Sequence, residues 1–484
     1  MALNKTDRIY IGIIALVGYL IYVQTIGFGL TYLDDNVLVG SARELGRAQT
    51  LVQAFIGDPI HAVTGGFYYR PAVVISYWLN AAIGGGGLAG YHVLNILLHV
   101  AVGVALYVLL RQLAMGAQAS LFASLLLMVH PLTAQAVAWI PGRNELLLAL
   151  FWIMSFGFLA AWLREGKGWL LAGHLAAYGL ALLSKEVALA IVPIGLIGLM
   201  RPIGRMGQIR FIRPIGLMGL LAGWVMITVA WAALRAHAIN SISPIGPISP
   251  IGLMGLMGQI GKLILPVHLS TYPIGQDMNI PIGLMSLIGL MGLIRLMRQI
   301  GSMRLIRLMG LLWIAVALAS TLLRPNIGQP GLEFLEHRLY LGVAGVAMII
   351  GLIGQIIPIR LIRSIGLIGL IGLMGLNFTN TRHYRDGMSY WKRAVETSPH
   401  SAFARNQLGV MDYFAHDLNG AAGEYTVALE LNPSEPLAHN NLGVVYMDEG
   451  KFRQAKNEFN QELRINPGYE NAIKNLKMVQ LREN

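Results

Sequence analysis

The chain contains long apolar stretches that carry almost no charge. Four of them lie at residues 9–30, 91–110, 146–163 and 169–183, and several approach the roughly 20 apolar residues that a helix needs to cross a bilayer core. Only 12% of the 484 residues are charged, whereas a soluble globular protein has about 25% charged residues. These features predict a polytopic membrane protein rather than a soluble globule.

The positive charge follows a pattern along the chain. If the N-terminus lies in the cytoplasm and about 11 transmembrane helices follow, the dense Arg and Lys clusters all fall in short cytoplasmic loops, as the positive-inside rule requires. This placement accounts for the net charge of +12 without a nucleic-acid partner, because no basic stripe with interleaved aromatic residues is present. The acidic pair Asp34 and Asp35 and the C-terminal tail then share the external side.

The N-terminal apolar run follows Lys5 and Arg8 and is about 22 residues long, which exceeds the apolar core of a signal peptide. We therefore expect it to remain as the first membrane helix. The chain contains no cysteine, which excludes disulfides, thiolate catalysis and cysteine-bound zinc. The compact helical part and short loops favour a bacterial inner membrane, with a cytoplasmic N-terminus and a periplasmic tail.

Residues 194–376 use a small alphabet of amino acids, in which the tripeptide Pro-Ile-Gly recurs. Roughly half of the 57 glycines lie there, and in water each would weaken a helix by about 1 kcal/mol. A glycine-rich surface for helix packing is one interpretation, and a poorly assigned or artificial stretch is the one that we favour. Single residues in this low-complexity stretch therefore carry little of the argument, except in the islands 311–324 and 333–341.

From residue 377 onward charged residues return and a repeat is present. Gly409 recurs as Gly443, and Tyr425 recurs as Phe459, at an offset of 34 residues. This period, with small and aromatic residues at these positions, is typical of tetratricopeptide repeats (TPRs), in which small residues let two antiparallel helices pack closely. The predicted fold is all-α, with a membrane helix bundle over residues 1–376 and a TPR α-solenoid over residues 377–484.

Asp34 and Asp35 directly follow the first predicted helix. Adjacent carboxylates at a membrane edge repel one another, so the pKa of one of them is raised unless a cation compensates. This arrangement suits a general base that acts on a hydroxyl, or half of a site for a divalent metal such as Mg or Mn. A solvated pair at a helix end is the simpler alternative.

Further polar residues lie at predicted helix ends on the same side as the acidic pair. Arginine and lysine side chains that face carboxylates at the outer interface suit an anionic lipid head group, because the cations hold a phosphate while a carboxylate deprotonates an acceptor. A charge at the membrane border can also reach water by itself, so each residue alone has a structural explanation. The candidates for substrate binding are Arg70, Arg143, Lys185, Glu186, His337 and Arg338.

Other chemistry is less well supported. His92, Asn95 and His99 share one face of a predicted helix and could bind zinc, but a buried polar contact between helices is the favoured interpretation. No glycine-rich phosphate loop with a Lys-Ser/Thr end is present, and no dinucleotide-binding fingerprint is followed by an acidic residue. ATPase and dehydrogenase activities are therefore excluded.

Together these motifs, in this order, resemble the transmembrane and tetratricopeptide-repeat O-mannosyltransferase family and its bacterial relatives, which are membrane glycosyltransferases of the GT-C type. The resemblance covers about residues 10–186 and 333 to the end, and the low-complexity stretch departs from it. The motifs that carry it are Asp34-Asp35, Tyr69-Arg70-Pro71, Tyr91-His92 with Asn95 and His99, His130-Pro131, Gly142-Arg143, Lys185-Glu186 and Glu336-His337-Arg338, followed by the repeats.

The resemblance implies an inverting transfer of a sugar from a polyprenyl or dolichyl phosphate to a protein hydroxyl. By position, Asp34 would be the base, and Asp35 would position the acceptor or a metal. Arg70, Arg143, Lys185 and Arg338 would bind the lipid phosphate, with Glu186 and His337 orienting them. The partners implied are the lipid-linked donor, and an acceptor or partner protein on the TPR tail.

Two other functions stay open at this point. A catalytically inert membrane scaffold, whose TPR tail recruits partners into a larger complex, would satisfy its outer polar groups among themselves. A transporter of the same lipid would need ionisable residues near the middle of the bilayer, and few are visible in the first 186 residues. The sugar, the exact lipid and the acceptor protein are not identified by the sequence.

Overall fold

The computed structural model shows an all-α protein, as predicted. No β-strand occurs in the part of the chain that it describes. That part comprises residues 3–44, 49–56, 68–84, 86–200, 214–238, 250–266, 269–274, 277, 281, 285, 304–322, 335–354 and 359–483.

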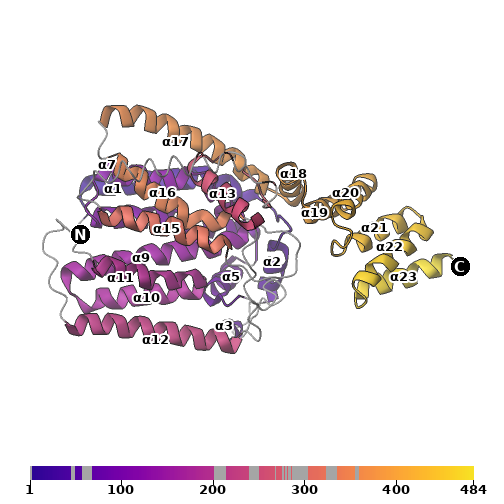
Figure 1. Ribbon diagram of the computed structural model, residues 1–484, viewed down its shortest axis with the longest axis horizontal. Coiled ribbons are helices and arrows are strands. Elements are labelled where there is room, and N and C mark those ends of the chain that lie inside the picture. The colour runs from indigo at the N-terminus through magenta and orange to yellow at the C-terminus, as the bar shows by residue number, and fades with distance from the viewer. Residues whose placement is uncertain are drawn as a thin grey trace.

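Long apolar helices lie side by side and form a bundle (Figure 1). Five spans in the described residues are long and apolar enough to cross a membrane: Lys5–Gly27, Leu88–Gln112, Ile140–Glu165, Gly216–Ala238 and Glu336–Ile353. They contain α1 Lys5–Tyr22 with η1 Val23–Gly27, α6 Leu88–Gln112, η2 Ile140–Gly142 with α9 Arg143–Glu165, most of α12 Pro214–Ala238, and η6 Glu336–Leu339 with α16 Tyr340–Ile353. The protein is therefore an integral membrane helix bundle.

Shorter or additional helices complete the bundle. They are α5 Pro71–Gly84, α7 Ala117–Val129, α8 Thr133–Ala138, α10 Gly168–Ser184, η3 Glu186–Ala190, α11 Ile191–Met200, α13 Pro250–Ile264, α15 Arg304–Leu322 and α17 Ile359–Thr381. In chain order, α1, α6, α7, α9, α10, α11 and α12 occupy the positions expected for the first seven of the 11 membrane helices, and α15, α16 and α17 occupy those of the last three. The eighth, which would return from about residue 281, lies almost entirely outside the described residues, so the total of 11 stays a prediction.

The external segment that we expect between the first membrane helix and Pro71 includes two helices that no long apolar run indicates. They are α2 Asp35–Glu44 and α3 Gln49–Ile56. Both are short, and α2 contains three charged residues, so neither has the apolar length by which a membrane span is recognised. With α5, they lie at the bundle end opposite the N-terminus (Figure 1).

Close packing of small residues occurs inside the low-complexity stretch. A Cβ atom added to Gly345 of α16 would lie 2.5 Å from the carbonyl oxygen of Gly310 in α15. The two backbones therefore approach as closely as glycine-mediated packing in membranes allows. For this helix pair, the structure supports the interpretation of glycine as a packing surface, which we had not favoured.

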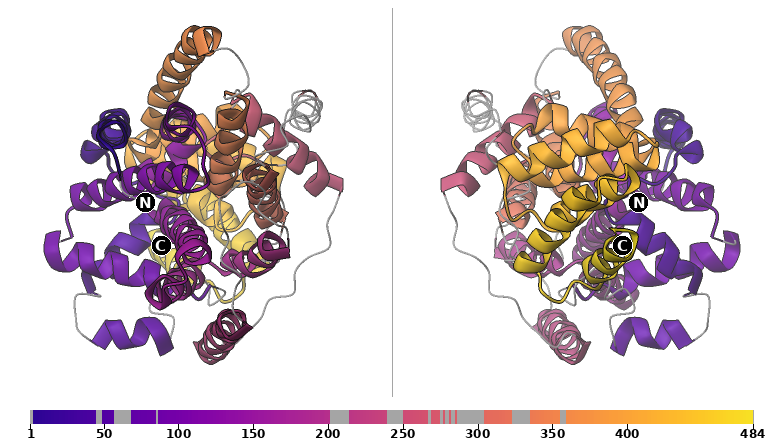
Figure 2. Two further views of the ribbon diagram at one scale, coloured as in Figure 1. Left: turned by 90° about the vertical axis from the view of Figure 1, so that its left-hand side faces the viewer. Right: turned by 90° about the vertical axis from the view of Figure 1, so that its right-hand side faces the viewer.

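The tail consists of α18 Gly387–Thr397, α19 Ala402–Phe414, α20 Leu418–Leu431, α21 Ala438–Asp448, α22 Phe452–Ile465 and α23 Glu470–Glu483. These helices extend from one end of the bundle (Figure 1) and lie in front of it when it is viewed from that end (Figure 2, right).

Equivalent glycines and aromatic rings pack together within the tail, as the 34-residue offset requires. A Cβ atom on Gly409 would lie 2.6 Å from the Tyr425 ring, and one on Gly443 would lie 2.7 Å from the Phe459 ring. The TPR assignment and the domain boundary stay predictions. Helix α17 continues across the proposed boundary between residues 376 and 377.

Candidate active site

The polar motifs gather at the end of the bundle from which the tail extends. The turn that follows α1 contacts the tail directly, because the Gly29 N–H donates to the Arg385 carbonyl oxygen at 2.7 Å. One apolar cluster joins the tail to three bundle segments, which lie just before Asp34, Arg143 and Glu336 in the chain. It includes Phe28, Trp139 and Leu335 from the bundle and Tyr384 and Trp391 from the tail. The acidic pair and the tail therefore lie at the same end of the molecule.

Asp35 is buried and closes the turn after α1. Its carboxylate accepts hydrogen bonds from the Thr31 N–H at 2.7 Å, the Thr31 hydroxyl at 3.0 Å and the Tyr32 N–H at 2.9 Å. Tyr32 has a φ of 61°, a left-handed conformation that costs energy for any residue with a side chain. Burial raises the pKa of Asp35, while these hydrogen bonds oppose the shift. Asp35 thus fixes the backbone that carries its neighbour.

Asp34 differs from Asp35 in that its carboxylate is not engaged. The side chain is half-buried and makes no hydrogen bond or ion pair with any described residue. Loss of hydration, followed by repulsion from Asp35, raises the pKa of Asp34 to about 6. A carboxylate with such a pKa is ionised near neutral pH and is a stronger base than an ordinary aspartate, which suits general base catalysis.

Two ion pairs join residues that sequence analysis placed at the same end of the bundle. Lys185 is paired with Glu145, and both side chains are buried. Arg70 donates to Glu186 at 3.4 Å and covers the Tyr68 ring, whose centroid lies 4.2 Å from its Cζ atom. The Glu186 and Arg70 side chains are less buried than the Lys185 and Glu145 side chains. The second pair is therefore the one closer to solvent.

Arg143 is fully buried between α5, α6 and α9. Its guanidinium donates to the Asn95 side-chain oxygen at 2.8 Å and to the Tyr91 and Ser76 carbonyl oxygens at 2.9 and 3.2 Å. The Tyr77 ring lies against it, 4.7 Å from the Cζ atom. Because all three guanidinium nitrogens donate to protein acceptors, Arg143 holds three helices together in this structure rather than presenting a free cation.

The turn that contains His337 and Arg338 joins the same end from α16. The His337 N–H donates to the Gln135 side-chain oxygen at 2.8 Å, and the His337 ring packs on Trp139. Arg338 is half-buried, and its guanidinium makes no hydrogen bond or ion pair with any described residue. Arg338 therefore differs from Arg143, whose guanidinium nitrogens all have acceptors within the described part of the chain.

Two of the polar residues of α6 contact neighbouring helices. His99 contacts the Tyr340 hydroxyl at 2.6 Å and Asn95 donates to the Val137 carbonyl oxygen at 3.2 Å, so both make the interhelical contacts that we favoured. Over the described ranges, no group of three His, Cys, Asp or Glu residues is arranged to hold a metal ion. The acidic pair also fits a divalent cation poorly, because the oxygens of Asp35 already accept hydrogen bonds from the protein.

Sequence analysis missed two residues that organise this end, Lys262 and Gln135. Glu336 accepts from Lys262 at 2.6 Å and from the Ser270 N–H at 2.9 Å, and Gln135 links His337 to Thr271. Lys262 lies in the low-complexity stretch, which we discounted. A lone lysine in an otherwise apolar helix was the signal that could have identified it.

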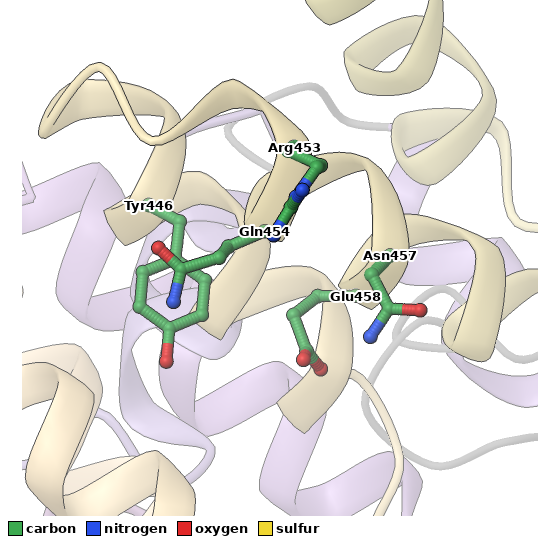
Figure 3. Close-up of a pocket in the computed structure, with 5 residues that line it drawn as sticks. All are labelled: Tyr446, Arg453, Gln454, Asn457 and Glu458. Carbon is green, nitrogen blue, oxygen red and sulfur yellow. The ribbon is translucent and has the colours of Figure 1, made fainter.

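A hollow of about 440 Å³ lies elsewhere, on the tail (Figure 3). It is formed by α21 and α22, and its residues come from the second full repeat rather than from the end of the bundle. Its lining is polar and open, so it does not extend the candidate site. The lining residues are Tyr446, Arg453, Gln454, Asn457 and Glu458.

Comparison with known proteins points to one group. The chain is 29% identical over 192 residues to Protein O-mannosyl-transferase Tmtc1 of Drosophila melanogaster, which covers 39% of this chain and 22% of that protein. It is 31% identical over 204 residues to Tmtc2 of the same organism, covering 40% and 21%. Human TMTC4 is 34% identical over 128 residues, covering 23% and 17%.

No family model matches the chain. The chain spans about a fifth of the length of the curated relatives that it matches. Over this limited part, it is similar to animal proteins named protein O-mannosyl-transferases.

Proposed function

We propose that this protein is a membrane glycosyltransferase that transfers a sugar from a polyprenyl-phosphate donor to a hydroxyl group of a protein. The observation that carries the proposal is that two charges at one end of the bundle have no partner among the described residues. Asp34 offers a half-buried carboxylate with a raised pKa, and Arg338 offers a half-buried guanidinium. The similarity to protein O-mannosyl-transferases supports the same chemistry.

The reaction is a displacement at the anomeric carbon of the sugar. Asp34 accepts the proton of the acceptor hydroxyl as its oxygen forms a bond to that carbon. The bond between the carbon and the phosphate oxygen breaks, and the electron pair leaves with the polyprenyl phosphate. Since the nucleophile attacks opposite the leaving group, the configuration of the sugar inverts. A phosphate leaves without a general acid because cations stabilise its charge.

The remaining site residues take supporting roles in this proposal. Asp35 holds the turn that presents Asp34, and Arg338 binds the lipid phosphate. Arg70 and Lys185 contribute positive potential near the phosphate while Glu186 and Glu145 orient them. His337 places Arg338 through its contacts with Gln135 and Trp139. Arg143 supports the site indirectly, by joining α5, α6 and α9.

The tail is proposed to bind the acceptor or a partner protein through its TPR helices. The site and the tail are proposed to face the bacterial periplasm, with the N-terminus in the cytoplasm. No divalent metal is included in the mechanism, because the acidic pair is a poor fit for one.

A direct test uses the purified full-length chain in lipid nanodiscs, a polyprenyl-phosphate-linked mannose and a mixture of periplasmic proteins. We expect a hexose-sized mass increase on Ser, Thr or Tyr residues, detected by peptide mass spectrometry. A chain that leaves every acceptor unmodified with several lipid-linked sugars would contradict the proposal.

A non-catalytic membrane scaffold is the second candidate. The observation that favours it is that Lys185 with Glu145 and Arg70 with Glu186 satisfy one another. A scaffold would assemble a complex through its tail, so co-purification of a stable partner together with absence of transfer would support it. The unengaged Asp34 and Arg338 are what favour the transferase over the scaffold.

The rate of transfer is expected to depend on the ionisation of Asp34. Because the pKa of this group is raised to about 6, the carboxylate is ionised above that pH and protonated below it. The ratio kcat/KM should therefore fall about tenfold per pH unit below the pKa and level off above it. A rate profile measured from pH 4.5 to 8 with a saturating acceptor would check this. A profile that is flat through pH 6 would contradict the role of Asp34 as the base.

Arg338→Ala is expected to weaken donor binding more than it slows the chemical step. The loss of a charge-assisted contact to phosphate corresponds to about 1.5–3 kcal/mol, or an increase of about 10-fold to 150-fold in the donor KM. Donor titrations at a fixed acceptor concentration would measure it. The matched control is Arg453→Ala, which removes an arginine from the tail hollow and should leave the donor KM unchanged. An unchanged donor KM in Arg338→Ala would remove this residue from the phosphate site.

A further inference from the structure

The tail contacts the turn that carries Asp34 at two points. The Gly29 N–H donates to the Arg385 carbonyl oxygen at 2.7 Å, just before α18. The Tyr32 ring packs against the Phe414 ring of α19, with centroids 6.1 Å apart. The backbone between Gly29 and Tyr32 is therefore held from the tail side as well as by Asp35 from within.

Gly387, the first residue of α18, allows this approach. A Cβ atom at this position would lie 2.5 Å from the Met411 Sδ atom, 2.9 Å from the Tyr32 Cδ2 atom and 3.4 Å from the Thr31 carbonyl oxygen. Glycine is otherwise unfavourable in a helix, by about 1 kcal/mol relative to alanine. A larger residue here would displace both the Met411 side chain of α19 and the Tyr32 ring of the turn, so glycine serves the packing of α18 against both.

The same helix contacts the part of the site that contains Arg338. The Tyr390 hydroxyl donates to the Thr271 carbonyl oxygen at 2.8 Å, and the Thr271 hydroxyl donates to the Tyr390 carbonyl oxygen at 2.9 Å. The Gln135 side-chain nitrogen donates to the same Thr271 oxygen at 3.2 Å, and its side-chain oxygen accepts from His337 N–H at 2.8 Å. Two residues thus connect α18 to the turn of His337 and Arg338.

A second connection runs in parallel with the first. Thr397 is the last residue of α18, and its hydroxyl lies 2.6 Å from the Ser270 hydroxyl. The Ser270 N–H in turn donates to the Glu336 carboxylate at 2.9 Å. Helix α18 therefore spans from the turn that holds the proposed base to the turn that holds the proposed phosphate ligand. The contacts are buried for the most part, so each has a defined geometry.

We propose that α18 sets the relative position of the base and the phosphate ligand, with Gly387 a positioning residue for Asp34 and Tyr390 a positioning residue for Arg338. The proposal rests on the proposed function and goes beyond it, because it makes the first tail helix part of the transfer site. A tail that only recruits a partner would leave the geometry of the site unchanged when α18 is altered.

The test compares a graded series at Gly387, to Ala, Val and Leu, with Gly443→Ala as the matched control. The control places a Cβ atom 2.7 Å from the Phe459 ring, so it strains the tail by a similar overlap, in a repeat that does not contact the turn. Tyr390→Phe removes one hydroxyl without changing shape. All variants are made in the full-length chain in nanodiscs.

The first readout is amide hydrogen exchange of the peptide that covers residues 28–38, which needs no substrate. We expect Gly387→Leu to speed exchange of this turn by about tenfold, with smaller effects for Val and Ala in order of size. Gly443→Ala should leave the exchange of the turn unchanged. Equal exchange in the whole Gly387 series and the parent would overturn the proposal.

The second readout is the division between kcat and the donor KM. The Gly387 series should lower kcat, by about tenfold or more for Leu, because misplacement of a base by a fraction of an ångström slows the chemical step. Tyr390→Phe should instead raise the donor KM by about threefold. Changes of the same kind in both variants and in Gly443→Ala would indicate loss of tail stability alone, and would overturn the proposal.

The two proposals fail in different ways. If the parent chain shows no transfer at all, the proposed function is lost, while the exchange experiment still decides whether α18 holds the turn. If transfer is present but the Gly387 series matches the parent in both readouts, the proposed function stands and the role of α18 is lost.

Discussion

Asp34→Asn is expected to abolish measurable transfer while the fold stays intact. The amide has nearly the same shape as the carboxylate but accepts no proton, so the acceptor hydroxyl must attack without a base. General base catalysis contributes about 10²-fold to 10⁴-fold to a rate, and kcat should fall by that factor. Because the Asp34 carboxylate makes no hydrogen bond or ion pair with a described residue, the change leaves no described group without its partner.

The control for this variant is Glu165→Gln. Glu165 ends α9 at the opposite end of the bundle and pairs with the exposed Lys167 at 2.8 Å. Glu165→Gln changes one carboxylate to an amide without altering the candidate site, so transfer should match that of the parent. Thermal unfolding in detergent should be alike for the parent, Asp34→Asn and Glu165→Gln. Normal kcat in Asp34→Asn would exclude Asp34 as the base.

Asp35→Asn is expected to behave differently from its neighbour. Its carboxylate accepts three hydrogen bonds that hold Tyr32 in a left-handed conformation, so its replacement disturbs the turn itself. The family resemblance gave Asp34 the role of base and gave Asp35 the role of positioning the acceptor or a metal, but it did not predict that Asp35 holds the turn. That structural role follows from the backbone N–H groups of Thr31 and Tyr32, whose directions depend on a turn that no sequence pattern indicated.

The fold was predictable where apolar length decides it and unpredictable where contacts decide it. The positions of α1, α6 and α9 follow from uninterrupted apolar runs. Helix α5 was missed because 14 residues are too few for a span. The close approach of Gly310 and Gly345 could not be inferred either, since glycine in a reduced alphabet is equally consistent with packing and with an artificial sequence.

The sequence predicted which types of residue lie at the site, but not which of their charged groups are already hydrogen-bonded to the protein. The sequence placed Arg143 and Arg338 in the same class, as cations at helix ends on one side. The structure separates them, because Asn95 and two carbonyl oxygens from α5 and α6 occupy the guanidinium of Arg143, whereas Arg338 has no such partners. Which acceptors surround a buried arginine is a property of three packed helices, and the order of motifs along the chain does not contain it.

Glu145→Ala is expected to destabilise the protein by about 3–5 kcal/mol, the largest effect on stability at this end of the bundle. Glu145 and Lys185 are both buried, with side chains that are 2% and 7% exposed. Removing the carboxylate leaves the lysine charge without its partner in a site that water reaches poorly. Thermal or denaturant unfolding in detergent, followed by circular dichroism, would measure the loss.

The double variant Glu145→Leu with Lys185→Met removes both charges, so it distinguishes the cost of one unpaired charge from the cost of losing the whole ion pair. Apolar residues of similar volume often replace a buried ion pair with little loss of stability, so the double variant should unfold close to the parent. The exposed pair of Glu165 and Lys167 is the control, and Glu165→Ala should unfold close to the parent, because exposed ion pairs add little stability. Equal losses in Glu145→Ala and in the double variant would show that packing, rather than the unpaired charge, is responsible.

The same double variant decides what Lys185 does in the proposed reaction. If Lys185 supplies positive potential to the lipid phosphate, the double variant folds normally but has a raised donor KM, because a cation near the leaving group has been lost. If the pair only joins α9 to the segment after α10, transfer is retained together with the fold. In that case Arg338 and Arg70 bind the phosphate without help from Lys185. Donor binding should then depend on Arg338 more steeply than on any other cation at this end, because Arg70 is paired with Glu186.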